Sequence, residues 1–495
     1  MRLASKIGCV VLGLALGPPL ASPLAPVVYA ARADVPTEVT YTKDIAPIIQ
    51  RSCENCHRVD GVAPMPLSNY EQVRPWARAM KQRTGIGRKA AVMPPWYVEK
   101  NIGIQEFQSD PSLSDEEIAK IAKWADSGAP RGNPADMPPA RVFPEGKAWT
   151  IGTPDLIVKL PEVTVKGNAP DWWGEIAYTQ IGLTEDRYVA ALEIKEFNDL
   201  EAAGNGRQTV GGRFVIHHMI WGTRVIAPGA ANDAVPGLPG GDTLAWPVHE
   251  VGRNADFFDP RSARLLRANS SIVSDSIHLH SNGRDTKAHL EIGFKLMPKD
   301  YKPAYRQALI ALGNGVDIDI KGMTPDQQLH AYAVLQENTK IISFEPHLHA
   351  PGARMCLEAI WGYNIQTLNC VGYDHNWVRG YNYTDDSAPL LPKGTILHII
   401  GFMNNSPSNK NVPDPRNWQG SGNRSVANMF IDLGNRVSLT DEQFLAEMKA
   451  RKEKLKLSRG SVMIGCPFCN LDLPDKLPNP AAPAATTRTP QQQQQ

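Results

Sequence analysis

The chain has 495 residues, of which 42% are hydrophobic and 21% are charged, so it can form sizeable buried cores but is too long for a single one. We therefore expect two or three domains. Lys and Arg number 52 against 51 Asp and Glu, so there is no overall field that attracts nucleic acid or anionic lipid. Both are excluded as partners bound through net charge.

The N-terminus has the pattern of a secretory signal peptide. Two basic residues precede an apolar stretch over residues 7–16, and Ala31-Arg32-Ala33 has the small-x-small form of a cleavage site. We predict a signal peptide over residues 1–33, cut after Ala30 or Ala33, and export to the bacterial periplasm or the medium with no membrane span in the mature protein. An uncleaved anchor is the alternative, but four prolines between residues 18 and 26 suit a membrane helix badly.

The run Cys53-Glu54-Asn55-Cys56-His57 is the most informative motif of the chain. Two thiols three positions apart can attach a porphyrin covalently, and the adjoining imidazole can ligate its iron. A redox thiol pair or half of a zinc site is the rival interpretation, but zinc would lack a second Cys or His pair nearby. We predict one covalent haem c, held by Cys53, Cys56 and His57.

A haem iron that carries electrons needs a sixth ligand, and a thioether favours its ferrous state. Met93 is the best candidate because two prolines follow it, which excludes helix and suits a loop that presents a side chain to the haem face. Met65 and Met80 are competing ligands. Simple packing of Met93 is the remaining alternative.

The segment around these residues has a helical pattern broken by Gly and Pro. Its last helix is well marked, because Ser114 and Glu117 form a capping box and an apolar stripe from Ile118 to Ala125 ends before Gly128.

Four motifs of this segment occur in the order found in class I cytochrome c domains of bacterial multidomain oxidoreductases. They are Tyr41 to Ile48, the haem motif, Met93-Pro94-Pro95-Trp96 and the Leu-Ser-Asp-Glu-Glu start of the last helix. Residues 34–135 resemble such a domain, which implies a small helical shell around the haem.

A Pro-rich linker over residues 136–149 separates this segment from a chain of different character. Short alternating strands are expected at Asp155 to Leu160, Tyr188 to Ile194 and Arg213 to Trp221, split by Gly, Pro and Asn turns. Many short strands with such turns are typical of β-sandwiches.

A helix predicted from Thr324 to about Gln336 marks the boundary between two β-sandwich domains, over residues 150–322 and 323–472. The predicted fold class is therefore multidomain, with a small helical domain followed by two β domains. Residues 473–495 are rich in Pro, Ala, Thr and Gln and should be disordered.

Four cysteines lie outside the signal peptide and the haem motif, an even number that fits an oxidising compartment. We predict a disulfide between Cys356 and Cys370. For Cys466 and Cys469, a local disulfide, a metal clip and a redox pair all stay open.

His217 and His218 are adjacent in an apolar strand, where successive side chains face opposite ways. Both reach one metal only where the strand bulges or where the two rings use nitrogens of different reach. Taken alone, this pair is better explained without a metal, with one ring hydrogen-bonded inside and the other at the surface. His249 and His375 are likewise interpreted as ordinary hydrogen-bonded positions.

Two further pairs change the balance. His278 with His280, and His347 with His349, have the i, i+2 spacing that places both imidazoles on one face of a strand. Two rings on one face are a natural way to chelate a single ion.

The motifs Ile-His-His-Met, Ile-His-Leu-His and Pro-His-Leu-His, followed by a late Met, occur in this order. The order resembles the copper type II monooxygenases, the group of peptidylglycine α-hydroxylating monooxygenase and dopamine β-monooxygenase. Enzymes of that family have two eight-stranded jelly-roll domains that carry one copper each. The resemblance therefore implies two jelly rolls and two copper ions.

By position, the resemblance assigns the first copper to His217, His218 and His278, with His280 as a neighbour or an alternative ligand. It assigns the second copper to His347, His349 and Met429, although the Asp and Glu of the family's Asp-Glu-Met stretch are Ala427 and Asn428 here. Met403 and Met355 compete with Met429 for the thioether position.

A thioether favours Cu(I), the state that binds oxygen, so the resemblance makes the copper of His347, His349 and Met429 the catalytic one. It implies hydroxylation of a C–H bond of a small organic substrate with O2. The haem would relay electrons from a periplasmic single-electron donor. The alternatives are a haem and copper electron-transfer protein without oxygenase activity, and a cytochrome fused to a metal-free β interaction module.

Overall fold

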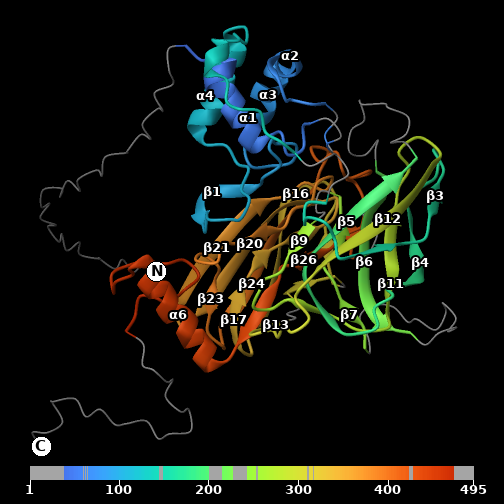
Figure 1. Ribbon diagram of the computed structural model, residues 1–495, viewed down its shortest axis with the longest axis vertical. Helices are drawn as coiled ribbons and strands as arrows, with labels where there is room; N and C mark the ends of the chain where they lie inside the picture. The colour runs from blue at the N-terminus through green and yellow to red at the C-terminus, as the bar shows by residue number, and fades with distance from the viewer. Residues whose placement is uncertain are drawn as a thin grey trace, which may run out of the picture.

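The computed structural model describes residues 38–58, 61, 63, 65–143, 149–199, 214–226, 242–251, 255–308, 312–315, 317–422 and 427–472. The predicted signal peptide and the predicted disordered tail lie outside these ranges. Figure 1 shows a helical region at one end of the molecule and two β regions that lie beside each other beneath it.

The helical region is built from short helices around its own apolar core. Its elements are Tyr41–Ile45, α1 (Ala46–Ser52), α2 (Tyr70–Val73), Arg74–Trp76, α3 (Ala77–Thr84), α4 (Asp115–Asp126) and Pro134–Asp136. The helix predicted after Ser114 is confirmed as α4, and its capping box with Glu117 is present. Ile121 and Trp124 of α4 are fully buried against Ile45 and Ile49.

One strand of this N-terminal part joins the sheet of the second β region. The strand is β1 (Val98–Gly103), which pairs antiparallel with β21 (Asn364–Gly372). Trp96 and Phe107, on either side of β1, are buried in the core of the second β region. Residues 96–107 therefore fix the helical region to the β structure.

The first β region consists of two sheets that pack face to face. Its strands are β2 (Leu156–Lys159), β3 (Val163–Val165), β4 (Trp172–Gln180), β5 (Arg187–Asn198), β6 (Ile216–Val225), β7 (Leu244–Ala245), β8 (His249–Glu250), β9 (Ala255–Phe257), β10 (Arg264–Leu266), β11 (Ser270–Leu279) and β12 (Thr286–Leu296). One sheet has the order β10-β5-β12-β2, and the other has the order β4-β11-β6-β7 with β8 beside β6. Val189 and Ile292 of the first sheet share a core with Trp221 and Ile277 of the second.

The second β region is dominated by the five-stranded sheet β1-β21-β20-β24-β16. Its elements are β13 (Arg306–Ala308), β14 (Leu312–Asn314), β15 (Asp319–Ile320), β16 (Thr324–Val334), β17 (Asn338–Ile341), β18 (Ser343–Phe344), β19 (Pro346–Leu348), β20 (Gly352–Trp361), β21, β22 (Tyr381–Asn382), β23 (Leu390–Leu391), β24 (Ile396–Asn405), β25 (Gln419–Gly420), β26 (Phe430–Asp432), β27 (Arg436–Leu439) and α6 (Asp441–Leu455). The mostly β architecture after Trp149 is confirmed. The eight-stranded jelly-roll topology stays a prediction.

The helix predicted from Thr324 to Gln336 is wrong. This segment forms β16, which pairs along its length with β24. Its Gln, Leu and Ala residues favour a helix. In the strand, however, every second side chain faces the core, where Leu329, Ala331 and Ala333 pack. Burial of this period-two face against the core, together with backbone pairing to β24, outweighs the local helix propensity.

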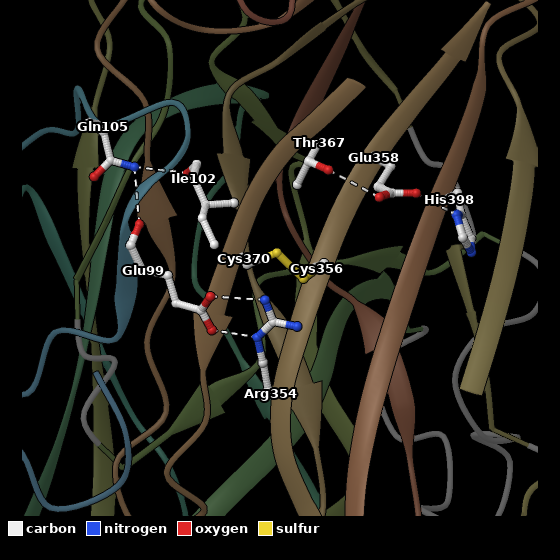
Figure 2. Close-up of a disulfide and its surroundings, with 9 residues drawn as sticks. All are labelled: Glu99, Ile102, Gln105, Arg354, Cys356, Glu358, Thr367, Cys370 and His398. Carbon is white, nitrogen blue, oxygen red and sulfur yellow. Dashed lines mark hydrogen bonds and ion pairs between the residues drawn. A yellow bond between two sulfur atoms is a disulfide. The ribbon is translucent and has the colours of Figure 1, made fainter. Parts of the chain in front are cut away.

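The second β region contains two disulfides. Cys356 of β20 and Cys370 of β21 lie directly opposite each other and are bonded, which confirms that prediction. Figure 2 shows this bond beside the ion pair that joins Glu99 of β1 to Arg354 of β20. Cys466 and Cys469 are also bonded to each other and are buried, so the local disulfide is the alternative that the structure contains.

None of the helices in the described ranges has the length and apolar character needed to cross a membrane.

Candidate metal centre

Seven histidine side chains gather where the two β regions meet, and we call them the histidine cluster. They are His217 and His218 of β6, His278 of β11, His280, His347 of β19, His349 and His375. Neighbouring ring centres lie 4.7 to 6.3 Å apart. The histidines that the family resemblance divides between two coppers thus lie in one connected group.

A β-bulge brings His217 and His218 to the same side of their strand. In the pairing of β11 with β6, His278 lies opposite His218, whereas the next residue, Leu279, lies opposite Ile216. His217 is the extra residue, and such an insertion re-aims side chains that would otherwise alternate. Two adjacent strand residues can share a metal where the strand bulges, and the structure contains such a bulge at His217.

The three residues assigned to the first copper form the tightest part of the cluster. One ring nitrogen from each of His217, His218 and His278 lies within 4.8 Å of the others, and all three side chains are buried. The Nδ1 atoms of His217 and His218 are 3.1 Å apart. Three imidazole nitrogens at this spacing can converge on a single ion.

The spaced pairs also behave as their sequence predicts. The ring centres of His278 and His280 are 5.2 Å apart, and the same separation is found between His347 and His349. His218 connects the two groups, because its ring centre lies 6.3 Å from those of both His347 and His349.

Burial favours the neutral form of four imidazoles of the cluster. It lowers the pKa of His217 and His218 well below the ordinary value, and the positive charges of neighbouring histidines lower it further. The pKa of His280 is lowered by burial too, and that of His375 falls to about 3, mainly through burial and then through His347. A neutral imidazole is the form that binds a metal ion, so these four rings can do so at neutral pH.

Glu250 is a buried carboxylate that orients one ring of the cluster. It lies opposite His218 in the pairing of β8 with β6, its residue is only 2% exposed, and its Oε1 accepts a hydrogen bond from Nδ1 of His347. This bond fixes the tautomer and leaves Nε2 of His347 as the ligand atom. Glu250 belongs to the first β region and His347 to the second, so the contact also ties the two regions together.

His278 has a similar partner on the other side of the cluster. Its Nε2 lies 3.3 Å from Oδ2 of Asp171, and this hydrogen bond is the main cause of the lowered pKa of Asp171. The ring of Trp173 covers the same side, at 4.8 Å from the ring centre of His218 and 5.8 Å from that of His278. An indole in this place excludes water from two of the three imidazoles.

Met429 directly precedes β26, the strand that pairs with β19 and therefore with His347. His347 pairs with Ile431 and Leu348 with Phe430, so Met429 and His349 each lie one residue beyond the paired strands. The competing Met355 and Met403 are fully buried in the apolar core of the second β region, where they act as packing residues.

In the predicted haem motif, one ring nitrogen of His57 forms a hydrogen bond. Nδ1 of His57 donates to the carbonyl oxygen of Met65 at 3.1 Å, so Nε2 is the nitrogen left for an iron. Cys53 and Cys56 are not joined by a disulfide. Burial raises the pKa of both thiols, that of Cys53 to about 12, whereas a redox thiol pair needs a lowered one.

The three methionines weighed as the sixth haem ligand lie in different surroundings. Met65 accepts the hydrogen bond from Nδ1 of His57 through its backbone carbonyl, and its side chain packs against the core of the helical region. Met80 packs in the core of the helical region. Met93 is 42% exposed in a loop, with its backbone N–H bonded to the carbonyl of Arg83. Met93 stays the predicted ligand.

Three contributors to this site could not be recognised from the sequence. Asp171 and Glu250 orient rings of the cluster, and His375, interpreted there as an ordinary hydrogen-bonded position, has its ring centre 5.1 Å from that of His217. The available signal was the presence of charged or imidazole residues in otherwise apolar and aromatic surroundings, at Trp246 to Glu250 and Tyr373 to Trp377.

In comparisons with known proteins, no family model matches the chain and no curated protein matches it significantly.

Proposed function

We propose that this protein is an exported copper-dependent monooxygenase that hydroxylates a C–H bond of a small organic substrate with O2, using electrons relayed through a covalently bound haem c. The observation that carries the proposal is the meeting of His217, His218 and His278 with His347 and His349 in one buried cluster. Three segments far apart in the sequence converge there, as a metal centre requires.

The donor set favours copper among the metals that imidazole binds. Imidazoles bind zinc, copper, iron and nickel alike, whereas a thioether such as that of Met429, next to the strand that pairs with His347, is a soft ligand that selects Cu(I). Copper would supply the one-electron steps and the binding of O2. Two ions are proposed, one held by His217, His218 and His278 and the other by His347, His349 and Met429.

The surrounding residues prepare these ligands. The carboxylate of Glu250 holds His347 in the tautomer that leaves Nε2 available. The hydrogen bond to Asp171 restricts rotation of the His278 ring. Both carboxylates offset positive charge that metal ions would bring into a buried site. Trp173 and the burial of the rings exclude water, which limits loss of electrons to solvent species.

The helical region supports the electron relay. The hydrogen bond from His57 to Met65 leaves a ring nitrogen for haem iron, and the high pKa of the neighbouring thiols argues against a redox thiol pair. The two disulfides of the second β region fit an oxidising compartment, where haem c is attached. We assign residues 34–135 to a cytochrome c domain on this basis.

A labelling experiment tests the proposal. The exported protein, loaded with copper and reduced through a one-electron mediator, is given 18O2 and a library of small organic compounds. We expect a hydroxylated product with one 18O atom per O2 consumed, the second oxygen leaving as water with two electrons and two protons.

One observation favours the alternative electron-transfer function, because the ring centre of His218 lies 6.3 Å from those of His347 and His349, only slightly further than the 5.0 to 5.4 Å within the first group. Reversible reduction of haem and copper without any 18O-labelled product would support that alternative and contradict the monooxygenase.

A further inference from the structure

The loop from Tyr373 to Arg379 spans the space between the histidine cluster and the helical region. His375 is its contribution to the cluster, with a ring centre 5.1 Å from that of His217. This separation lies within the range of ring-centre distances among the predicted ligands His217, His218 and His278, which is 5.0 to 5.4 Å.

The ring of His375 has an unused ligand atom. Its Nδ1 is buried, and no hydrogen-bond partner for it exists among the residues that the structure describes. A buried polar atom without a partner is unfavourable, and such atoms in native proteins call for an explanation such as an ion. A metal bound between His375 and the other rings would satisfy this nitrogen.

The opposite side of the same loop holds the haem-bearing part of the chain. Oδ2 of Asp374 accepts hydrogen bonds from the backbone N–H of Ala91 at 2.9 Å and from the hydroxyl of Tyr97 at 3.4 Å. Ala91 is two residues before Met93, the predicted sixth haem ligand. Because Asp374 directly precedes His375, its hydrogen bond to Ala91 links the loop that carries Met93 to His375.

The far end of the loop also contacts the segment around Met93. The guanidinium of Arg379 lies over the ring of Trp96, at 5.6 Å from its centre. The loop therefore contacts the cluster through His375 and the segment around Met93 through Asp374 and Arg379.

We propose that His375 is an additional metal ligand of the histidine cluster and the point at which electrons from the haem enter it. This inference rests on the proposed function, since it requires both haem and copper to be bound. In the transfer step, ferrous haem is oxidised to ferric haem and one Cu(II) is reduced to Cu(I), and the external single-electron donor then restores the ferrous haem. Asp374 is a positioning residue, because it acts through the loop and not on the metal.

The test compares His375→Gln with His289→Gln in the full-length, haem-loaded and copper-loaded protein. Glutamine keeps much of the shape of the imidazole, which protects folding, and His289 lies on β12 outside the cluster, stacked on Phe197. Two readouts are followed: the Cu(II) electron paramagnetic resonance spectrum with copper affinity, and the rate at which photoreduced haem is reoxidised by Cu(II) without oxygen.

We expect His375→Gln to change the Cu(II) spectrum, weaken copper binding about 10- to 100-fold and slow haem reoxidation at least as much, with the haem spectrum intact. His289→Gln should match the wild type. In Asp374→Asn, copper binding should persist while haem reoxidation slows. A wild-type copper spectrum and a wild-type rate in His375→Gln would overturn the inference, whereas failure of the wild type to bind copper would overturn the proposed function itself.

Discussion

The predicted haem motif and the histidine cluster differ in how their candidate metal-binding side chains are brought together. The three residues of the predicted haem motif fall within five consecutive positions, from Cys53 to His57, whereas the rings of the cluster come from β6, β11, β19 and loops between His217 and His375. The first site is made by local sequence and the second by strand pairing. Each can therefore be removed without the other, and this independence is what the following experiments use.

The largest effect is expected from His347→Ala. Removing this ring takes a proposed ligand from the catalytic copper and leaves Glu250 as a buried charge without its partner, so we expect turnover to be abolished while the haem absorption spectrum is unchanged. Product formation and haem spectra of the same preparation check this.

The matched control for His347→Ala is His330→Ala. His330 is an exposed histidine of β16, hydrogen-bonded to His398 on the five-stranded sheet and outside the cluster. It should retain activity. Product formation at the wild-type rate by His347→Ala would contradict the assigned site.

A smaller effect is expected from Glu250→Gln. The amide can still accept a hydrogen bond from His347 but carries no charge, and loss of such an orienting partner lowers metal affinity about 10- to 100-fold. Competition with a copper chelator measures this affinity. Glu291→Gln is the control, because Glu291 contacts His289 at 3.3 Å in a comparable pair outside the cluster. Equal copper affinities in the two variants would show that Glu250 does not act at the metal site.

Met93→Ala tests the other half of the comparison. If Met93 is the sixth haem ligand, its loss leaves the ferric iron five-coordinate or bound to water, and the absorption spectrum should change from low spin to high spin. Copper content should stay at the wild-type level, because Met93 lies in the helical region. An unchanged spectrum would transfer the axial role to another residue.

How far the sequence predicts these sites follows from the same contrast. The haem motif and α4 with its capping box depend on neighbours in sequence, and both could be identified before the fold was known. The helix expected over β16 was wrong because its strand partner, β24, lies some seventy residues later in the chain. Glu250 and His375 could not be assigned for a related reason. Their roles depend on which strands and loops meet, and no local pattern records that.

The smallest effect concerns pH, and its sign follows from the lowered pKa values. In the unfolded chain each histidine takes up a proton near pH 6.5, whereas burial keeps folded His217 and His218 neutral to well below that pH. Between these limits the unfolded state binds more protons, so stability is complete above about pH 6.5 and falls as the pH falls.

For the copper-free protein, each such residue should lower the free energy of unfolding by up to about 1.4 kcal/mol per pH unit in this window. Thermal unfolding between pH 7.5 and 5 measures the slope, and His218→Gln should reduce it. The same slope in this variant and the wild type would mean that the ring is not held neutral by the fold.

The measurement that tests the central claim most directly is the metal content of the exported, haem-loaded protein after reconstitution with Cu(I) and removal of loosely bound ions. We predict two copper ions for each iron in the wild type, with a lower value in His218→Ala and an unchanged haem content. Protein that carries its haem and retains no copper would contradict the account.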